Sequence, residues 1–173
     1  MTAKIIDGKR ISEEVKAEVE VGVKEMKIKH GIVPGLAVVL VGDDPASAVY
    51  VRNKQRAATE VGMLAKDILL PESAKESAVL DELDRLGSDD RFHGVLVQLP
   101  LPSHIRKSVV IGSISPKKDV DGLHPLNMGL LVEGRHLYPP ATPAGIQQIL
   151  LRTGNDPEGK HVVVCGRSDI VGK

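Results

Sequence analysis

Aromatic residues and cysteine are scarce in this sequence, and neither sign of charge predominates. Aromatic residues make up 2% of the 173 residues, and the single cysteine is Cys165. One cysteine cannot form an internal disulfide, which argues against a small disulfide-linked secreted domain. The 23 basic and 23 acidic residues cancel, and no basic block is interleaved with aromatic residues, so we expect no nucleic-acid partner. A small-molecule partner fits this composition better.

Long apolar segments are also missing. The longest apolar runs, at residues 36–41 and 162–165, are far shorter than the roughly 20 residues that cross a bilayer. Residues 1–10 lack the apolar stretch of a signal peptide. We therefore expect no membrane partner and a cytoplasmic protein, with one ordinary domain and a fragment of a second.

Patterns typical of helices and strands alternate along the first two thirds of the chain. Helices are expected at residues 11–26, 46–61, 74–86 and 105–111, and strands at residues 35–41, 64–70 and 94–97. The first and last of these strands are continuous apolar runs, which are typical of parallel strands covered on both faces. The order of elements predicts an α/β fold, a three-layer αβα domain with a mainly parallel sheet.

The remainder of the chain is less regular. Turn-forming residues dominate 116–140, which we interpret as an active-site loop and hinge, because long irregular loops in compact domains are usually functional. Thr142 and Pro143 match the pattern of a helix start, which predicts a helix over 143–152. A strand at 161–165, with Cys165 buried in it, and a glycine-bounded turn that opens a helix would begin a second domain.

Three polar side chains share one face of the helix expected at 46–61. Ser47, Tyr50 and Lys54 are separated by three and then four residues, a spacing that aligns them along the helix. A lysine on an amphipathic helix is usually a solvated surface charge. The spacing alone therefore leaves a surface lysine and a functional lysine both open.

Two further polar residues follow expected strand ends or turns. Gln98 comes directly after the strand at 94–97, where open α/β sheets place their ligands, although it could simply end the strand. Asp121 lies in Lys118-Asp-Val-Asp-Gly122, which lacks the ligand spacing of a calcium loop. Its carboxylate could accept two hydrogen bonds from an amino-pyrimidinone edge, or it could be a solvated turn aspartate.

The segment Gly166-Arg-Ser-Asp-Ile-Val-Gly172 has the context of a dinucleotide-binding turn, with Ser168 where the usual motif has its second glycine. Backbone N–H groups would receive phosphates there, and Arg167 or Ser168 could meet a ribose phosphate. Arg167 favours NADP over NAD without deciding between them. The six histidines show no metal-ligand spacing, so we predict no metal site.

Five segments in this order closely resemble the bifunctional methylenetetrahydrofolate dehydrogenase/cyclohydrolase family. They are Ser47-Ala-Val-Tyr-Val-Arg-Asn-Lys54, Gly94-Val-Leu-Val-Gln-Leu-Pro-Leu-Pro102, Pro116-Lys-Lys-Asp-Val-Asp-Gly122, Ala141-Thr-Pro143 and Gly166-Arg-Ser-Asp-Ile-Val-Gly172. The resemblance implies a folate-binding catalytic domain over 1–140, a linking helix over 141–155, and the beginning of a Rossmann NADP-binding domain over 156–173. Ala141 stands where the family commonly has cysteine, and we assign it no role.

The family's reactions would be oxidation of 5,10-methylenetetrahydrofolate with NADP, or alternatively NAD, and hydrolysis of the methenyl product to 10-formyltetrahydrofolate. The resemblance makes Lys54 the catalytic lysine, with Gln98 as its partner, Tyr50 packed on the folate and Asp121 holding the pterin. The implied substrate contacts are Ser47, Tyr50, Lys54, Gln98, Leu99, Pro100 and Asp121. The implied cofactor contacts are Thr142, Gly166, Arg167, Ser168, Val171 and Gly172.

The family's proteins continue well beyond residue 173. This chain is therefore expected to be either part of a longer enzyme or a truncation that lacks hydride transfer. The alternatives are a non-catalytic folate-binding fragment and an unrelated Rossmann dehydrogenase. For the full-length protein the resemblance implies a homodimer and a place in one-carbon metabolism and purine biosynthesis.

Overall fold

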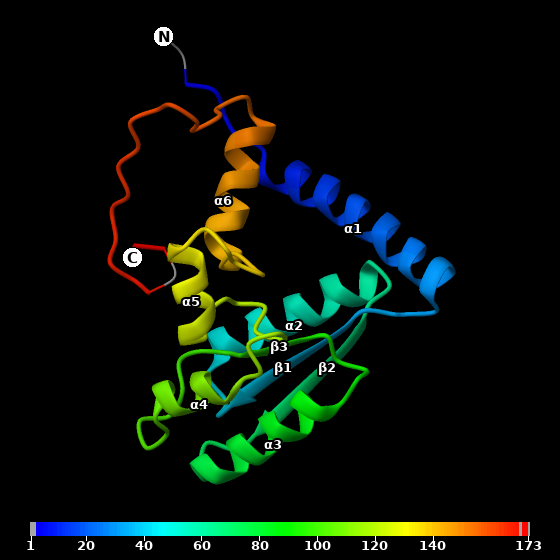
Figure 1. Ribbon diagram of the computed structural model, residues 1–173, viewed down its shortest axis with the longest axis vertical. Helices are drawn as coiled ribbons and strands as arrows, with labels where there is room; N and C mark the ends of the chain where they lie inside the picture. The colour runs from blue at the N-terminus through cyan, green and yellow to red at the C-terminus, as the bar shows by residue number, and fades with distance from the viewer. Residues whose placement is uncertain (1–2, 170, 173) are drawn as a thin grey trace.

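The computed structural model describes residues 3–169 and 171–172, which form a three-layer αβα unit with additional helices beyond one end of its sheet (Figure 1). Met1, Thr2, Lys173 and Ile170, a member of the expected nucleotide-binding turn, lie outside the described residues. The elements are α1 (Gly8–His30), β1 (Gly35–Val41), α2 (Pro45–Glu60), β2 (Leu64–Leu70), α3 (Glu76–Ser88), β3 (Gly94–Val97), α4 (Lys107–Ser113), α5 (Pro125–Val132) and α6 (Ala141–Arg152).

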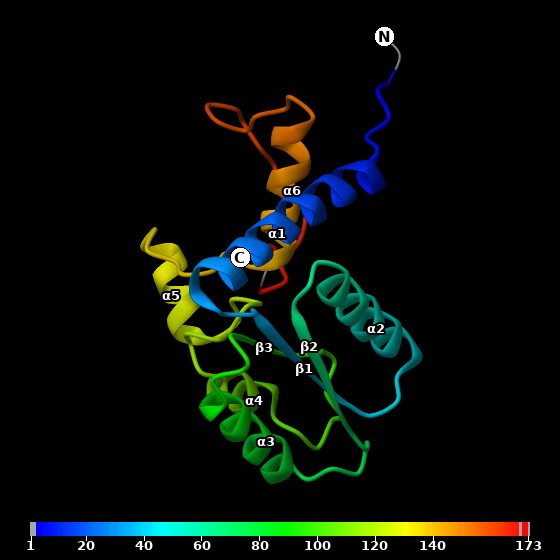
Figure 2. The same ribbon diagram turned by 90° about the vertical axis from the view of Figure 1, so that its right-hand side faces the viewer.

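The three strands form a parallel sheet in the order β2-β1-β3. Because side chains alternate along a strand, the two faces of β1 enter different clusters. Ala37, Val39 and Val41 pack toward α3 and α4, while Val38 and Leu40 pack with Val51 of α2. Figure 2 shows α2 on one side of the sheet and α3 on the other. The predicted three-layer arrangement and parallel sheet are confirmed.

The larger of the two hydrophobic clusters lies between the sheet and α3. Leu83 is 2% exposed there, in a cluster that includes Val39 of the central strand and Val110 of α4. By contrast, Leu69 on the edge strand β2 is 69% exposed. The two leucines therefore form a matched pair for measuring the contribution of this core.

Leu83→Ala should lower the free energy of unfolding by ~2–5 kcal/mol, because it removes buried apolar surface and leaves a cavity. Leu69→Ala, at an exposed position, should change it by no more than ~0.5 kcal/mol. Urea denaturation of both variants measures the difference. Equal midpoints would show that α3 does not pack on the sheet as described.

Capping residues set the ends of the first two helices. The Asp7 carboxylate accepts a hydrogen bond from the Arg10 N–H at 3.0 Å, and Gly31 ends α1 in the left-handed conformation with φ of 69°. The Asp44 carboxylate accepts from the Ser47 N–H at 2.7 Å, and Pro45 occupies the first turn of α2. Both are ordinary N-caps, and the second fixes where the face with Ser47 begins.

The region 116–140 is not the wholly irregular loop expected, because it contains α5. His124 caps this helix, its Nδ1 accepting from the Leu126 N–H at 3.0 Å, and Pro125 lies in the first turn. A proline after the capping residue fits the usual helix start, but histidine is an uncommon cap, which explains why the prediction missed the helix.

The expected strand at 161–165 is wrong. These residues are exposed coil, and Cys165 is exposed rather than buried. A parallel strand needs a neighbour to receive its backbone hydrogen bonds, and no pairing to this segment occurs within residues 3–169 and 171–172. Turn residues follow at 169, 171 and 172.

Helices α1 and α6 lie together beyond one end of the sheet (Figure 1). The Arg152 guanidinium at the end of α6 donates to both oxygens of Glu18 on α1, at 2.8 and 2.7 Å. This two-pronged geometry fixes orientation as well as distance. No helix within the described residues is long and apolar enough to cross a membrane.

Candidate functional site

Helix α2 presents its polar face where β1 and β3 end. Ser47 is buried, at 3% exposure, Lys54 is partly buried, and Tyr50 is 62% exposed. Val51 and Ala58, four and eleven residues after Ser47, lie on the same side of the helix and are also buried, Val51 in the cluster with Val38 and Leu40 of β1. Lys54 is therefore not the fully solvated lysine that the helical spacing left open.

Gln98, directly after β3, connects Lys54 of α2 to the central strand β1. Its backbone N–H donates to the Val39 carbonyl at 2.8 Å, and its side-chain Nε2 donates to the Leu99 carbonyl at 2.8 Å. With the amide nitrogen held in this way, Oε1 accepts a hydrogen bond from Lys54 Nζ at 3.2 Å. The predicted pairing of lysine and glutamine is thus present as a contact between α2 and the end of β3.

A cavity of about 270 Å³ opens beside this pair. Its lining residues come from α2, the end of β3, the segment after residue 118 and the start of α6, and they are Lys54, Val97, Gln98, Leu99, Asp121, Leu123, Ala141 and Thr142. Five predicted site residues, Lys54, Gln98, Leu99, Asp121 and Thr142, therefore meet in one place. The charged groups among them are one ammonium and one carboxylate.

Burial and two charges act on the Asp121 carboxyl group. Burial raises its pKa above the ordinary value, the Lys54 ammonium lowers it, and the neighbouring Asp119 carboxylate raises it, with burial the largest effect. A desolvated carboxylate facing a cavity is a strong acceptor for ligand N–H groups. Perturbed groups of this kind in a cleft are typical of functional sites.

Other predicted contacts lie outside this cavity. Pro100 lines a neighbouring cavity of about 210 Å³ together with Asp44 and Glu72. Ser47 lies one turn before Tyr50, at the start of α2, where its N–H donates to the carboxylate of the capping residue Asp44. Neither Ser47 nor Tyr50 lines the cavity around Lys54.

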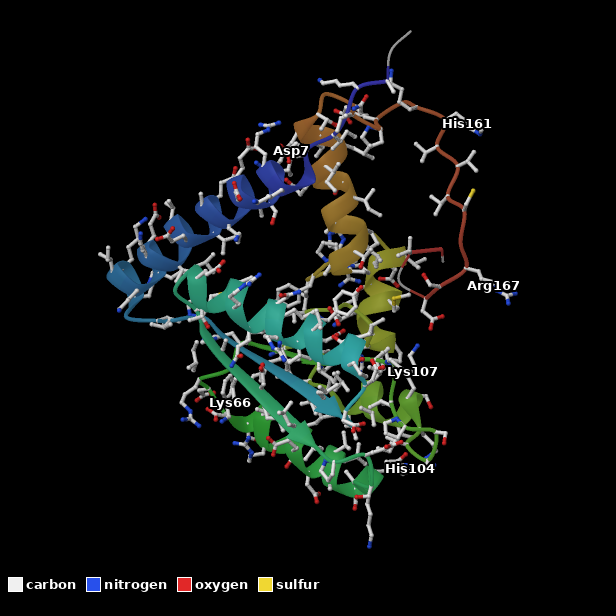
Figure 3. The ribbon with its side chains drawn as sticks, turned by 180° about the vertical axis from the view of Figure 1, so that it is seen from behind. Asp7, Lys66, His104, Lys107, His161 and Arg167 are labelled. Atoms are coloured by element: carbon white, nitrogen blue, oxygen red, sulfur yellow. The ribbon has the colours of Figure 1, made fainter. Side chains whose placement is uncertain are left out.

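The expected cofactor residues are not gathered into one site. Thr142 lines the cavity around Lys54, whereas Gly166, Arg167 and Ser168 are exposed. Figure 3 shows the Arg167 side chain pointing outward from the C-terminal coil. Val171 lines a separate apolar cavity of about 490 Å³ between α5, α6 and this coil.

The turn itself has a feature that suits a phosphate. A Cβ on Gly172 would collide with the backbone of Gly166 and Arg167, so the two ends of the turn approach too closely for any residue but glycine. Ser168 Oγ accepts from the Val171 N–H at 3.2 Å. The last glycine of a dinucleotide-binding turn is needed for close packing of this kind, so Gly172 fits that motif.

Prediction from the sequence missed several residues of the site. Val97, Leu123 and Ala141 line the cavity with no polar atom to mark them. Asp119 and Asn127, each 1% exposed, do not line the cavity, but Asp119 accepts a hydrogen bond from the N–H of Leu123, which does. The only sequence signal for Asp119 was its place in Asp119-Val-Asp121, and spacing does not show which carboxylate turns inward. Within the described residues no group of three or more His, Cys, Asp or Glu side chains could hold a metal ion.

Comparisons with known proteins give consistent matches over nearly the whole chain. Residues 6–121 match the family model described as tetrahydrofolate dehydrogenase/cyclohydrolase, catalytic domain, and residues 140–173 match the NAD(P)-binding domain of the same family. The bifunctional protein FolD of Streptococcus agalactiae is 50% identical over 169 residues, which are 98% of this chain and 60% of that protein. FolD of Bacillus cytotoxicus is 49% identical over 173 residues, 100% of this chain and 60% of that protein.

Solved structures agree. The bifunctional FolD of Campylobacter jejuni has a TM-score of 0.93 at 42% identity, over 98% of this chain and 60% of that chain. The Trypanosoma brucei FolD, solved with NADP and an inhibitor, has a TM-score of 0.94 at 35% identity, over 99% and 59%. The chain therefore spans about 60% of the length of the relatives it matches, and it comprises an α/β domain followed by the start of an NAD(P)-binding domain.

Proposed function

Because the chain belongs to the tetrahydrofolate dehydrogenase/cyclohydrolase family, as its motifs predicted, we propose that it provides the folate half of a bifunctional enzyme. The enzyme oxidises 5,10-methylenetetrahydrofolate with NADP and hydrolyses the methenyl product to 10-formyltetrahydrofolate. The observation that carries this proposal is the cavity in which Lys54, Gln98 and Asp121 meet. Residues 1–140 form the folate-binding domain, 141–155 the linking helix, and 156–173 the beginning of the dinucleotide-binding domain.

Asp121 holds the pterin in this proposal. An ionised carboxylate can accept two N–H donors from the amino-pyrimidinone edge, and its partly desolvated position in the cavity strengthens such hydrogen bonds. Tyr50, exposed on the helix face one turn before Lys54, packs on the folate outside the cavity. Ser47, Leu99 and Pro100 complete the substrate contacts.

Lys54 acts in the hydrolytic step. Hydrolysis of a methenyl cation requires a water molecule to be positioned and its proton to be taken up. Lys54 Nζ, at the edge of the cavity, is the group placed to position that water and to exchange a proton with it. The Gln98 amide holds Nζ at 3.2 Å and so keeps it at the edge of the cavity.

The oxidative step depends mainly on orientation. NADP, when bound, supplies the nicotinamide that accepts a hydride from the methylene carbon. The chain's own part is to hold the folate through Asp121, with Lys54 beside the reacting carbon, so that the methylene carbon faces the cofactor. Gly166, Arg167, Ser168, Val171 and Gly172 bind the cofactor from the turn, and Thr142 contacts it from the start of α6. Arg167 would favour NADP, with NAD as the alternative, by pairing with a 2′-phosphate.

The wider setting belongs to the same proposal. The full-length protein is a homodimer that works in the cytoplasm, in the one-carbon metabolism that supplies purine biosynthesis. The single cysteine, Cys165, is consistent with a reducing compartment. The near-neutral charge balance is consistent with a partner that is a small molecule rather than a nucleic acid.

Two assays on the protein test the proposed function. We expect loss of the 5,10-methenyltetrahydrofolate absorbance faster than in buffer, and NADP reduction when 5,10-methylenetetrahydrofolate is supplied. Folate binding and hydrolysis without NADP reduction would restrict the protein to the folate half of the chemistry. Absence of binding to any tetrahydrofolate derivative would refute the proposal.

A further inference from the structure

Asp119 carries a buried carboxylate. The proposed chemistry assigns it no role. Its residue is 1% exposed, and its segment is anchored beside β3, where the Val95 N–H donates to the Lys118 carbonyl at 2.7 Å and Val95 bridges to Asp119. Ionised groups are rarely buried without full hydrogen bonding. The hydrogen bonds to this carboxylate therefore show what it does.

Three donors converge on the Asp119 side chain. Oδ1 accepts from the Leu123 N–H at 3.3 Å, and Oδ2 accepts from the His124 N–H at 2.8 Å. Oδ2 also accepts from Asn127 Nδ2 at 2.8 Å. Two of these donors come from the main chain four and five residues later, so the carboxylate closes a ring of backbone around residues 120–122.

Asp121 lies inside that ring. The next residue, Gly122, has φ of 66°, and a Cβ there would stand 3.3 Å from the Pro140 nitrogen and the Tyr138 carbonyl oxygen. The segment is thus held by Asp119 on one side. On the other side it packs closely against Tyr138 and Pro140, just before α6. Asp121 and Leu123, on either side of Gly122, both line the cavity.

We propose that Asp119 is a positioning residue for folate binding, which holds the 120–124 segment so that Asp121 faces the amino-pyrimidinone edge of the substrate. This inference rests on the proposed function and adds to it. Asp119 does not touch the substrate. It acts through the backbone N–H groups of Leu123 and His124 and through the amide of Asn127.

The negative charge of Asp119 also acts on Asp121. Besides Asp119, the charged group that acts on Asp121 is Lys54 from α2, since Gln98 and Thr142, which reach the cavity from β3 and α6, are uncharged. Because Asp119 raises the pKa of Asp121, removal of its charge should lower that pKa. If folate binds the ionised carboxylate, binding is lost as the pH falls through this pKa.

Tetrahydrofolate affinity measured by calorimetry between pH 4 and pH 8 tests the proposal. Asp119→Asn should weaken binding about tenfold at pH 8, since hydrogen bonds to a charged group are lost, and should move the acid midpoint of binding to a lower pH. Loss of structure alone would weaken binding without lowering the midpoint. Asp84→Asn, on the exposed side of α3, is the matched control and should leave both quantities unchanged.

Asn127→Ala separates the positioning effect of Asp119 from the effect of its charge. It removes the amide that donates to Asp119 Oδ2 and leaves the carboxylates of Asp119 and Asp121 in place. It should weaken binding by a smaller factor, with the midpoint not lowered and the circular dichroism spectrum unchanged, which distinguishes displacement of Asp121 from loss of structure. If Asp119→Asn does not fold, as judged by circular dichroism, unchanged affinity in Asn127→Ala overturns the proposal. Unchanged affinity and midpoint in a folded Asp119→Asn also overturn it. Failure of the unmodified chain to bind tetrahydrofolate would instead refute the proposed function.

Discussion

Lys54→Met should lower the rate of 5,10-methenyltetrahydrofolate hydrolysis by a factor on the order of 10³, because general acid–base catalysis contributes about 10²- to 10⁴-fold. Methionine has a similar length and no basic nitrogen, so the hydrogen bond to Gln98 Oε1 is lost while the shape of the cavity is kept. Folate affinity should change much less than the rate, since Asp121 remains in place. A stopped-flow assay of the methenyl absorbance measures the rate.

Lys9→Met is the control for Lys54→Met. Lys9 is exposed on α1, and its substitution should leave turnover within a factor of about two, as expected for a surface position. Full hydrolytic turnover in Lys54→Met would show that another group handles the proton. Lys54 would then have no catalytic role, which is the alternative that the helical spacing left open.

Asp121→Asn should have opposite effects on binding and on stability. Tetrahydrofolate binding should weaken by about 10- to 100-fold, since hydrogen bonds to a charged acceptor contribute about 1.5–3 kcal/mol. The melting temperature at pH 7, by contrast, should rise. Functional sites commonly carry such a cost in stability.

The sign of the stability change follows from the pKa of Asp121, which burial raises in the folded protein. Below the ordinary pKa both the folded and the unfolded chain are protonated, so the group contributes nothing. As the pH rises through the ordinary value and then the raised one, the folded chain must hold a charge that its surroundings disfavour. Stability is therefore lost across that window and stays lower at neutral pH. The uncharged amide of the Asp121→Asn variant removes this loss.

Melting curves at pH 4 and pH 7 test this prediction. The difference in melting temperature between Asp121→Asn and the unmodified chain should be larger at pH 7 than at pH 4. Asp81→Asn, an exposed position on α3, should show no such difference. A lower melting temperature for Asp121→Asn at pH 7 would mean that the carboxylate stabilises the fold.

The strands could be predicted to the residue, for an identifiable reason. β1, β2 and β3 each begin and end where the sequence pattern placed them, because glycine or proline lies at or near their starts and most of their side chains are apolar. Helix ends were less accurate. α1 begins at Gly8, where Asp7 caps it, although its apolar periodicity starts only at Ile11.

The site could be predicted only in part. The helical spacing aligned Tyr50 with Lys54 but could not show that Lys54 is partly buried and Tyr50 exposed, since that depends on Gln98 and on the start of α6. The resemblance to a family, rather than the spacing, assigned Lys54, Gln98 and Asp121 to one folate site. The strand at 161–165 was predicted from its apolar run alone, and a strand also requires a neighbour, which a local pattern cannot reveal.

The two aspartates of Asp119-Val-Asp121 show the same limit. Both are acidic, both lie in one turn, and only the donors from Leu123, His124 and Asn127 determine that Asp119 points into the protein. Those donors come from a loop and from α5, which the sequence pattern did not predict. The tertiary structure therefore assigns different tasks to two residues that the sequence could not separate.

Calorimetric titration of tetrahydrofolate into the unmodified chain, Lys54→Met and Asp121→Asn tests most directly whether the cavity lined by Lys54, Gln98 and Asp121 is a folate site. We predict saturable one-to-one binding to the unmodified chain, similar binding to Lys54→Met, and binding to Asp121→Asn that is weaker by about 10- to 100-fold. Equal affinity for the unmodified chain and Asp121→Asn would contradict the assignment.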